Sequence, residues 1–86
     1  MLYSAQIRAA RALLGWTQAE LAARAGVGLA TLQRVEQSEG VARGIFSTVM
    51  KVQRTLEDAG IRFIDSDEVE GIGVRLTKPE PDRGST

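Results

Sequence analysis

Apolar side chains recur every three or four positions along much of residues 4–59, which is the spacing of amphipathic helices. The spacing predicts helices over residues 4–14, about 28–37 and 46–59. Their apolar positions, in chain order, are Ile7, Ala10, Leu13 and Leu14; Leu32 and Val35; and Phe46, Val49, Val52 and Leu56. Gly15 and Gly60 follow the first and the last of these helices and can terminate them.

A further, shorter helix is predicted to begin after Thr17. Thr17 can act as its N-cap, and Glu20, three residues later, completes a capping box. Trp16 and Leu21 occupy the two positions of a hydrophobic staple, which fixes the angle at which the chain enters a helix. We therefore predict a helix over residues 18–25.

Only Gly26, Val27 and Gly28 separate this short helix from the next one. Gly26 can take the positive φ that a tight turn between helices demands, and Gly28 is a permissive N-cap. Ala22 is small, as a close crossing of two helices requires. The arrangement predicts a helix-turn-helix whose second helix keeps its outer face free. The side chains expected on the inner faces are Leu21, Val27, Leu32 and Val35.

The pattern changes its period after these helices. Two short β-type runs, IRFI at 61–64 and GVRL at 73–76, predict a β-hairpin with an irregular loop between them. Residues 77–86 contain the two prolines and little apolar content, which is typical of a flexible tail. We therefore divide the chain into a helical part, residues 1–60, a hairpin extension, residues 61–76, and the tail.

A resemblance to a known family is carried by the stretch TQAELAARAGVGLATLQRVE and by IRAARALLGW before it. Together they resemble the helix-turn-helix domain of the Cro/C1-type repressors, the XRE family, over roughly residues 5–60. The resemblance implies a mainly α fold, a lambda-repressor-like helix-turn-helix bundle of four to five helices, here with a short C-terminal β-hairpin. The hairpin extension is similar to the C-terminal part of short bacterial regulators of this type.

In that family the second helix of the motif enters the DNA major groove. The resemblance implies that the groove-facing residues here are Gly28, Leu29, Ala30, Thr31, Gln33 and Arg34. Contacts to DNA phosphates are expected from Thr17, Gln18 and Arg43. Leu29 and Ala30 can touch thymine methyl groups but cannot form bidentate base contacts, and Gly28 has no side chain to bond DNA. Base reading is therefore expected mainly from Thr31, Gln33 and Arg34.

The charge distribution agrees with an anionic partner for the helical part. The 86-residue chain has no net charge. Residues 1–54, however, hold seven basic and three acidic side chains, a net charge of +4, whereas residues 55–86 hold four basic and eight acidic ones, a net charge of −4. The first part can approach an anionic polymer and the second repels one. A chain of this length buries only a small core, for which dimerisation is one source of additional stability.

Absent residue types narrow the chemistry further. The chain has no histidine and no cysteine, which removes the commonest metal ligand, disulfides and thiolate chemistry. It also has no P-loop and no nucleophile elbow, so we expect no catalytic residue, no cofactor and no enzyme. Asp65, Asp67, Glu68 and Glu70 do not fit a calcium loop, because the glycine that an EF-hand requires would fall on Glu70. We expect no metal site.

Several side chains have a structural interpretation beside a DNA-binding one. Arg11 matches the family's arginine that pairs with a glutamate, here Glu36, and a guanidinium fork suits a carboxylate; a phosphate contact is the alternative. Arg34 is expected to contact DNA, with simple solvation as the alternative. Trp16 is expected in the staple and not under a stacked base. The basic side chains expected to be solvated are Arg8, Arg24 and Lys51.

We therefore expect a sequence-specific, double-stranded DNA-binding transcriptional regulator, a repressor that acts as a homodimer in the bacterial cytoplasm, associated with the nucleoid. No apolar run is long enough to span a membrane. The alternative is a protein-interaction module, such as an antitoxin-like regulatory subunit, with the same fold. For the hairpin two arrangements stay open: pairing across a two-fold axis with a second copy, or packing back on the helix at 46–59 within one chain.

Overall fold

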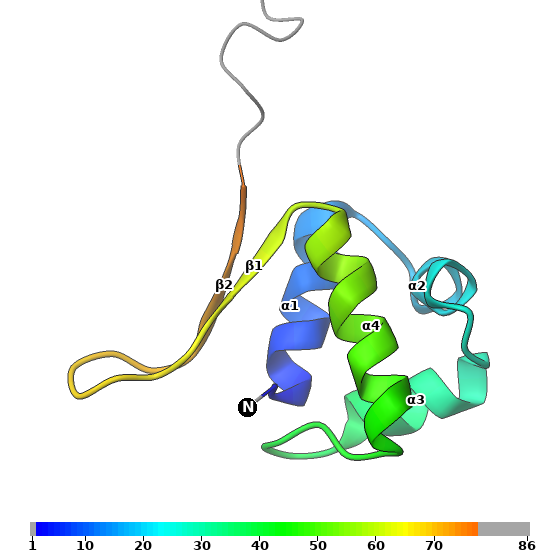
Figure 1. Ribbon diagram of the computed structural model, residues 1–86, viewed down its shortest axis with the longest axis horizontal. Coiled ribbons are helices and arrows are strands. Elements are labelled where there is room, and N and C mark those ends of the chain that lie inside the picture. Colours follow the sequence, from blue (N-terminus) through cyan, green and yellow to red (C-terminus); the bar gives the residue numbers. More distant parts are fainter. Residues whose placement is uncertain (1, 78–86) are drawn as a thin grey trace, which may run out of the picture.

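The computed structural model of the protein describes residues 2–77. These residues form four helices and one two-stranded antiparallel sheet (Figure 1). In chain order the elements are α1 (Ser4–Leu14), α2 (Gln18–Ala25), α3 (Leu29–Gln37), α4 (Phe46–Asp58), β1 (Ile61–Ile64) and β2 (Gly73–Leu76). The expectation of a mainly α bundle with a C-terminal hairpin is confirmed. Apart from Thr77, the tail expected at 77–86 lies outside the described residues.

The start of α2 shows why the helix boundaries could be located closely. Thr17 Oγ1 accepts from the Glu20 backbone N–H at 3.0 Å, and Glu20 Oε1 accepts from the Thr17 backbone N–H at 2.8 Å. The capping box is therefore present, and it satisfies two backbone donors that a helix start leaves without partners. The hydrogen bond from the Thr17 backbone N–H also holds the pKa of the Glu20 carboxyl below its usual value, with help from the Thr17 hydroxyl and the charge of Arg24.

The core lies where α1, α2, α3, α4 and the start of β1 meet. Its buried apolar side chains are Ile7, Ala10, Leu21, Ala22, Ala25, Leu32, Val35, Val52, Leu56 and Ile61. The inner-face positions expected for the helix-turn-helix are confirmed: Leu21, Leu32 and Val35 are at most 1% exposed, and Val27 packs against the core half-buried.

Two apolar positions of the helical pattern lie outside this core, and for these the pattern was wrong. Leu13 is 46% exposed and Phe46 is 77% exposed. At ~100° per residue, Val49, Val52 and Leu56 point in nearly one direction, whereas Phe46 points roughly 90° away from it. Phe46 is also the first residue of α4. Its side chain is therefore available on the surface.

The hairpin is attached to the helices within the same chain. β1 and β2 pair with Phe63 opposite Val74, and both side chains pack against the core beside the buried Ile61. The amide nitrogen of Gln6, a residue of α1 that is 2% exposed, donates to the carbonyl oxygens of Ile64 at 3.1 Å and Gly73 at 2.9 Å. The base of the hairpin therefore adopts the in-chain arrangement, with α1 as well as α4 as its support.

Beyond this base, the hairpin projects away from the helices (Figure 1). Asp67 organises its loop: Asp67 Oδ1 accepts from the backbone N–H groups of Val69 at 2.8 Å and Glu70 at 2.7 Å. The same two hydrogen bonds hold the pKa of the Asp67 carboxyl below its usual value. The irregular loop expected between the strands is thus organised over residues 67–70 by one of its own side chains.

Candidate nucleic-acid interface

The turn between α2 and α3 sets the angle at which α3 leaves the bundle. Gly26 has φ +70° and the Val27 backbone N–H bonds the Ala22 carbonyl at 3.0 Å, which closes the last turn of α2. A Cβ on Gly26 would meet no atom within 4 Å, so the requirement for glycine is conformational and not steric. Gly28 then returns to an extended conformation and caps α3 without a side-chain hydrogen bond. In Figure 1 α2 is seen nearly end-on while α3 runs across the foot of α4.

The two faces of α3 differ sharply in exposure. Leu32, Val35 and Glu36 are buried. The exposed side chains are Leu29, Ala30, Gln33, Arg34 and Gln37, which we call the α3 outer face. Gly28 is exposed at its N-terminal end and Thr31 is half-buried at its margin. All six groove-facing candidates of the sequence are thus accessible, with Thr31 the least available for reading bases.

Glu36 fixes α3 against α1 and α2 from the buried side. Its side chain is 2% exposed and its two carboxylate oxygens accept a guanidinium fork from Arg11, at 2.8 Å from Nε and 2.9 Å from Nη2. The same carboxylate accepts from Gln18 Nε2 at 3.0 Å, and the Glu36 backbone carbonyl accepts from Arg8. The expected Arg11–Glu36 pair is confirmed. Three side chains from two helices therefore hold the last turn of α3.

The three candidate phosphate contacts lie in different surroundings. Thr17 is exposed and its hydroxyl oxygen already accepts the helix-capping bond of α2. Gln18 is half-buried, and one of its two amide hydrogens is used by Glu36. Arg43 is exposed in the loop between α3 and α4. Thr17 and Gln18 therefore lie at the start of α2, while Arg43 lies beside the end of α3.

Arg43 and Arg34 line the same open depression, together with Gln37, Ser38 and Gly44. No acidic side chain is among these five residues. The two guanidinium groups and the Gln37 amide offer hydrogen-bond donors of the kind that bind phosphate oxygens, while the Ser38 hydroxyl donates to the Arg34 carbonyl at 3.4 Å. Sequence reasoning missed Gln37 here, although its spacing of four residues from Gln33 places both on one helix face.

Two arginines expected to be solvated have partners. Arg8 donates to the Glu36 carbonyl, as described above, and the Arg24 guanidinium lies 4.4 Å from the centroid of the Trp16 ring. Both stay exposed, as expected, and each long side chain also reaches a carbonyl or a ring on a neighbouring element. Trp16 packs partly buried against the core with Arg24 over its ring, so it is not an open platform for a base. Lys51 is exposed, as expected.

Comparison with known families identifies the segment that carries this interface. A family model described as Helix-turn-helix matches residues 7–43, which include α2, α3 and the loop with Arg43, and it confirms the Cro/C1-type resemblance. No curated protein and no solved structure matches the chain. Among the described residues, no helix is long and apolar enough to cross a membrane, and no group of three or more acidic, histidine or cysteine side chains is placed to hold a metal.

Proposed function

We propose, from the membership of residues 7–43 in the Cro/C1-type helix-turn-helix family, the XRE family, that this DNA-binding regulator is a sequence-specific repressor and acts as a homodimer. The observation that carries the proposal is the accessible α3 outer face, which continues into the depression lined by Arg34 and Arg43. A dimer would place two copies of α3 on a palindromic operator, about one DNA turn apart. Occupying an operator that overlaps a promoter would repress, because it excludes other proteins from the same DNA.

Phosphate contacts and base contacts fall on different parts of the interface. Arg43, Gln18 and Thr17 flank α3 and would bind phosphates, which supplies affinity and orientation without sequence information. Gln33 and Arg34 offer polar groups to base edges, and Arg34 is suited to guanine. The remaining α3 side chains would contribute less to base recognition. Leu29 and Ala30 would contact thymine methyl groups, and Thr31 and Gln37 would contact DNA at the edge of the interface.

The variant Arg34→Ala tests whether α3 recognises the base sequence. The operator comes from selection of bound duplexes out of a random library, and affinity is measured by fluorescence anisotropy. We expect the binding free energy for the operator to weaken by ~1–3 kcal/mol and the sequence preference to relax at one base pair. Arg43→Ala should weaken binding to every sequence alike and lower the slope of log affinity against log salt by about 1. Arg62→Ala, an exposed arginine on β1, is the matched control and should bind normally. Unchanged affinity and selectivity in Arg34→Ala would contradict the proposal.

One observation favours a second candidate function. Leu29 is 43% exposed and adjoins Ala30, so the N-terminal half of the α3 outer face is apolar. Such a surface also suits an apolar partner protein, as in an antitoxin-like regulatory subunit. Salt dependence separates the two: DNA affinity must fall steeply as salt rises, whereas an apolar protein contact need not weaken.

A further inference from the structure

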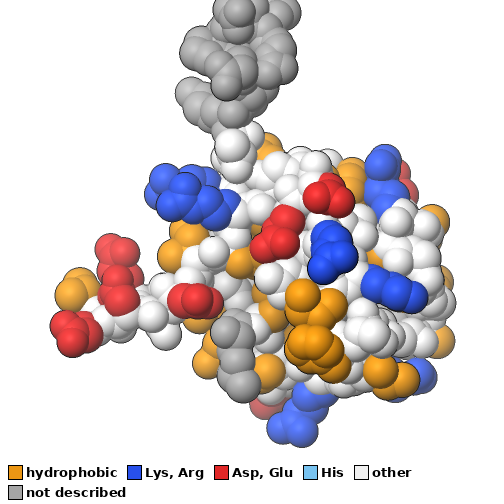
Figure 2. Space-filling view, in the orientation of Figure 1, with side chains coloured by type: hydrophobic (Ala, Val, Ile, Leu, Met, Phe, Trp, Pro, Cys, Tyr) orange, Lys and Arg blue, Asp and Glu red, His pale blue; other side chains and the backbone are white. Residues whose placement is uncertain are grey.

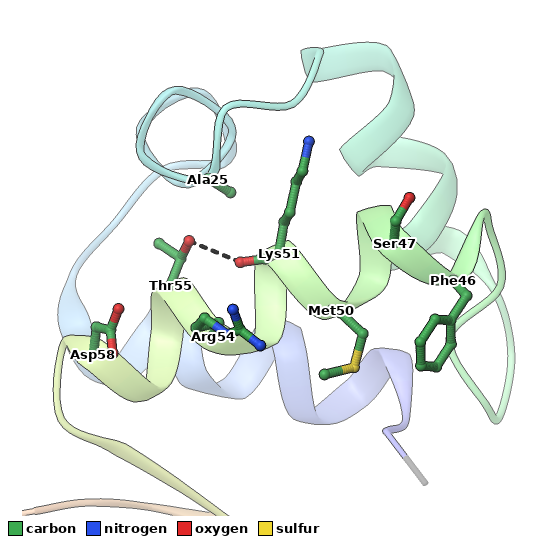
Figure 3. Close-up of a pocket in the computed structure, with 8 residues that line it drawn as sticks. All are labelled: Ala25, Phe46, Ser47, Met50, Lys51, Arg54, Thr55 and Asp58. Carbon is green, nitrogen blue, oxygen red and sulfur yellow. Dashed lines mark hydrogen bonds between the residues drawn. The ribbon is translucent and has the colours of Figure 1, made fainter.

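An apolar groove on the outer side of α4 plays no part in the proposed DNA interface. Phe46 and Met50 form its apolar end, and Phe46 is 77% exposed beside Ile45, which is 73% exposed. The groove has a volume of about 510 Å³ and reaches across to Ala25 of α2 (Figure 3). A groove of this size accepts a few side chains of a partner and leaves apolar surface in water until it is filled.

The charges around the groove define the partner. Lys51 and Arg54 are exposed and line it beside the apolar end, while Asp58 lies at the far end. Asp58 also borders a second depression with Arg24. Because Asp58 lies at the far end, the part of the groove next to Phe46 has the positive charges of Lys51 and Arg54. Figure 2 shows basic side chains next to a hydrophobic patch on this face of the molecule. The groove therefore suits an apolar side chain flanked by carboxylates.

The chain itself carries such a segment at the tip of its hairpin. Residues 65–70, which we call the arm tip, contain four acidic side chains and no basic one. Val69 lies between Glu68 and Glu70 and is 88% exposed. The Asp67 turn holds this segment in shape before any partner binds, which lowers the entropic cost of docking. Figure 2 shows acidic side chains gathered toward the tip of the projecting hairpin.

The arm tip cannot reach the groove of its own chain. The base of the hairpin is fixed by the buried Ile61 and by the two hydrogen bonds from Gln6, and from there the hairpin projects to one side of α1 and α4. The groove opens on the other side of α4, toward α2. The two complementary surfaces can therefore meet only between copies.

We propose that the arm tip of one copy docks in the α4 groove of a second copy. Val69 enters between Phe46 and Met50, and Glu68 and Glu70 approach Lys51 and Arg54. A two-fold axis between the copies would exchange both arms, so that each copy supplies one arm tip and one groove. The inference deepens the homodimer of the proposed function, and its test needs no DNA, so failure of the arm contact is distinguishable from failure of DNA binding.

The test is charge reversal on either side of the contact, with dimerisation measured by sedimentation of the full chain. Lys51→Glu/Arg54→Glu and Glu68→Lys/Glu70→Lys should each weaken the dimer by about tenfold or more, because like charges then face each other. An equimolar mixture of the two variants should dimerise as the wild type does, since both contacts of the mixed dimer again join opposite charges. Truncation of the hairpin is a poorer test, because it also removes Ile61 from the core.

A matched control reverses two charges elsewhere. Arg34→Glu/Arg43→Glu changes the net charge as the groove variant does, but on the DNA-facing side, and should leave dimerisation unchanged. A wild type that stays monomeric, a dimer that tolerates both reversals, or a mixture that stays monomeric would each overturn the proposal. So would reversals of Lys51 and Arg54 that weaken DNA binding but not dimerisation, which would make the groove a phosphate contact. Thermal melts of every variant confirm that the fold is retained.

Discussion

The buried pair of Arg11 and Glu36 should respond unequally to loss of either partner. Glu36 is 2% exposed at its side chain, so removing Arg11 leaves a buried carboxylate with only Gln18 as a side-chain donor. Breaking a buried ion pair in this way costs ~3–5 kcal/mol. Arg11, in contrast, is 20% exposed and also donates to the Trp16 carbonyl at 3.1 Å, so water can solvate it when Glu36 loses its charge. We expect the free energy of unfolding to fall by about 3 kcal/mol in Arg11→Met and by about 1–2 kcal/mol in Glu36→Gln.

These losses are large for a chain of this size. At ~0.05–0.15 kcal/mol per residue, the free energy of unfolding should be roughly 4–13 kcal/mol. A loss of 1 kcal/mol lowers Tm by ~4–8 °C in a domain of this size, so Arg11→Met should melt ~12–24 °C below the wild type. Urea unfolding followed by far-UV circular dichroism measures both variants, with unchanged m-values as evidence that only stability has changed.

The double variant decides whether the unpaired charge of Glu36 causes the loss of stability in Arg11→Met. Adding Glu36→Gln to Arg11→Met removes the unpaired carboxylate, so the double variant should be more stable than Arg11→Met alone. Arg62→Met changes an exposed arginine in the same way and should stay within about 0.5 kcal/mol of the wild type. Equal costs for the two single variants, or a double variant less stable than Arg11→Met, would refute the reasoning.

Further outcomes concern the turn and the hairpin loop. Gly26→Ala should cost ~1–2 kcal/mol, because φ +70° is unfavourable for any side chain, and a melting temperature equal to the wild type would disprove the assigned turn. Gly28→Ser should instead gain a few tenths of a kcal/mol by supplying the missing N-cap hydroxyl; a lower Tm would argue against this. Ala22→Leu should overpack the helix crossing and cost ~1–3 kcal/mol in urea unfolding. Because the pKa of Asp67 is lowered in the folded chain, its full stabilisation is present above pH 3.8, the ordinary value, and is lost as the pH falls through the lowered pKa. The Val69 amide resonance should report that transition in an NMR titration, and Asp67→Asn should abolish it.

Local sequence signals were sufficient for the helices and strands. The capping box at Thr17, the glycine after α2 and the period of two at 61–64 each act over a few residues, and the structure has each element where these signals predict it. α4 ends one residue earlier than expected, at Asp58. Such signals succeed because the interactions behind them join neighbours in the sequence.

Side-chain partners from distant parts of the chain could not be predicted in the same way. Gln6 bonds two strand carbonyls that lie 58 and 67 positions further along the sequence. Nothing local to Gln6 specifies such a role, since glutamine in a helix is usually exposed. The contact of Arg8 with the Glu36 carbonyl could not be predicted for the same reason, whereas the Arg11–Glu36 pair was expected only because the family resemblance supplied its partner.

Gln18 connects the positioning of α3 with the proposed binding of phosphate. One hydrogen of its side-chain amide is held by Glu36, which also holds Arg11, and the second remains as a donor at the start of α2. A phosphate bound there would be oriented, through Gln18, by the same carboxylate that fixes α3. Contacts to the DNA backbone and contacts to the bases would then be positioned by one side chain, Glu36. This differs from a phosphate held by a flexible lysine, which would supply charge but little orientation. On the proposed function, the buried pair would therefore set the register on DNA as well as contribute to stability.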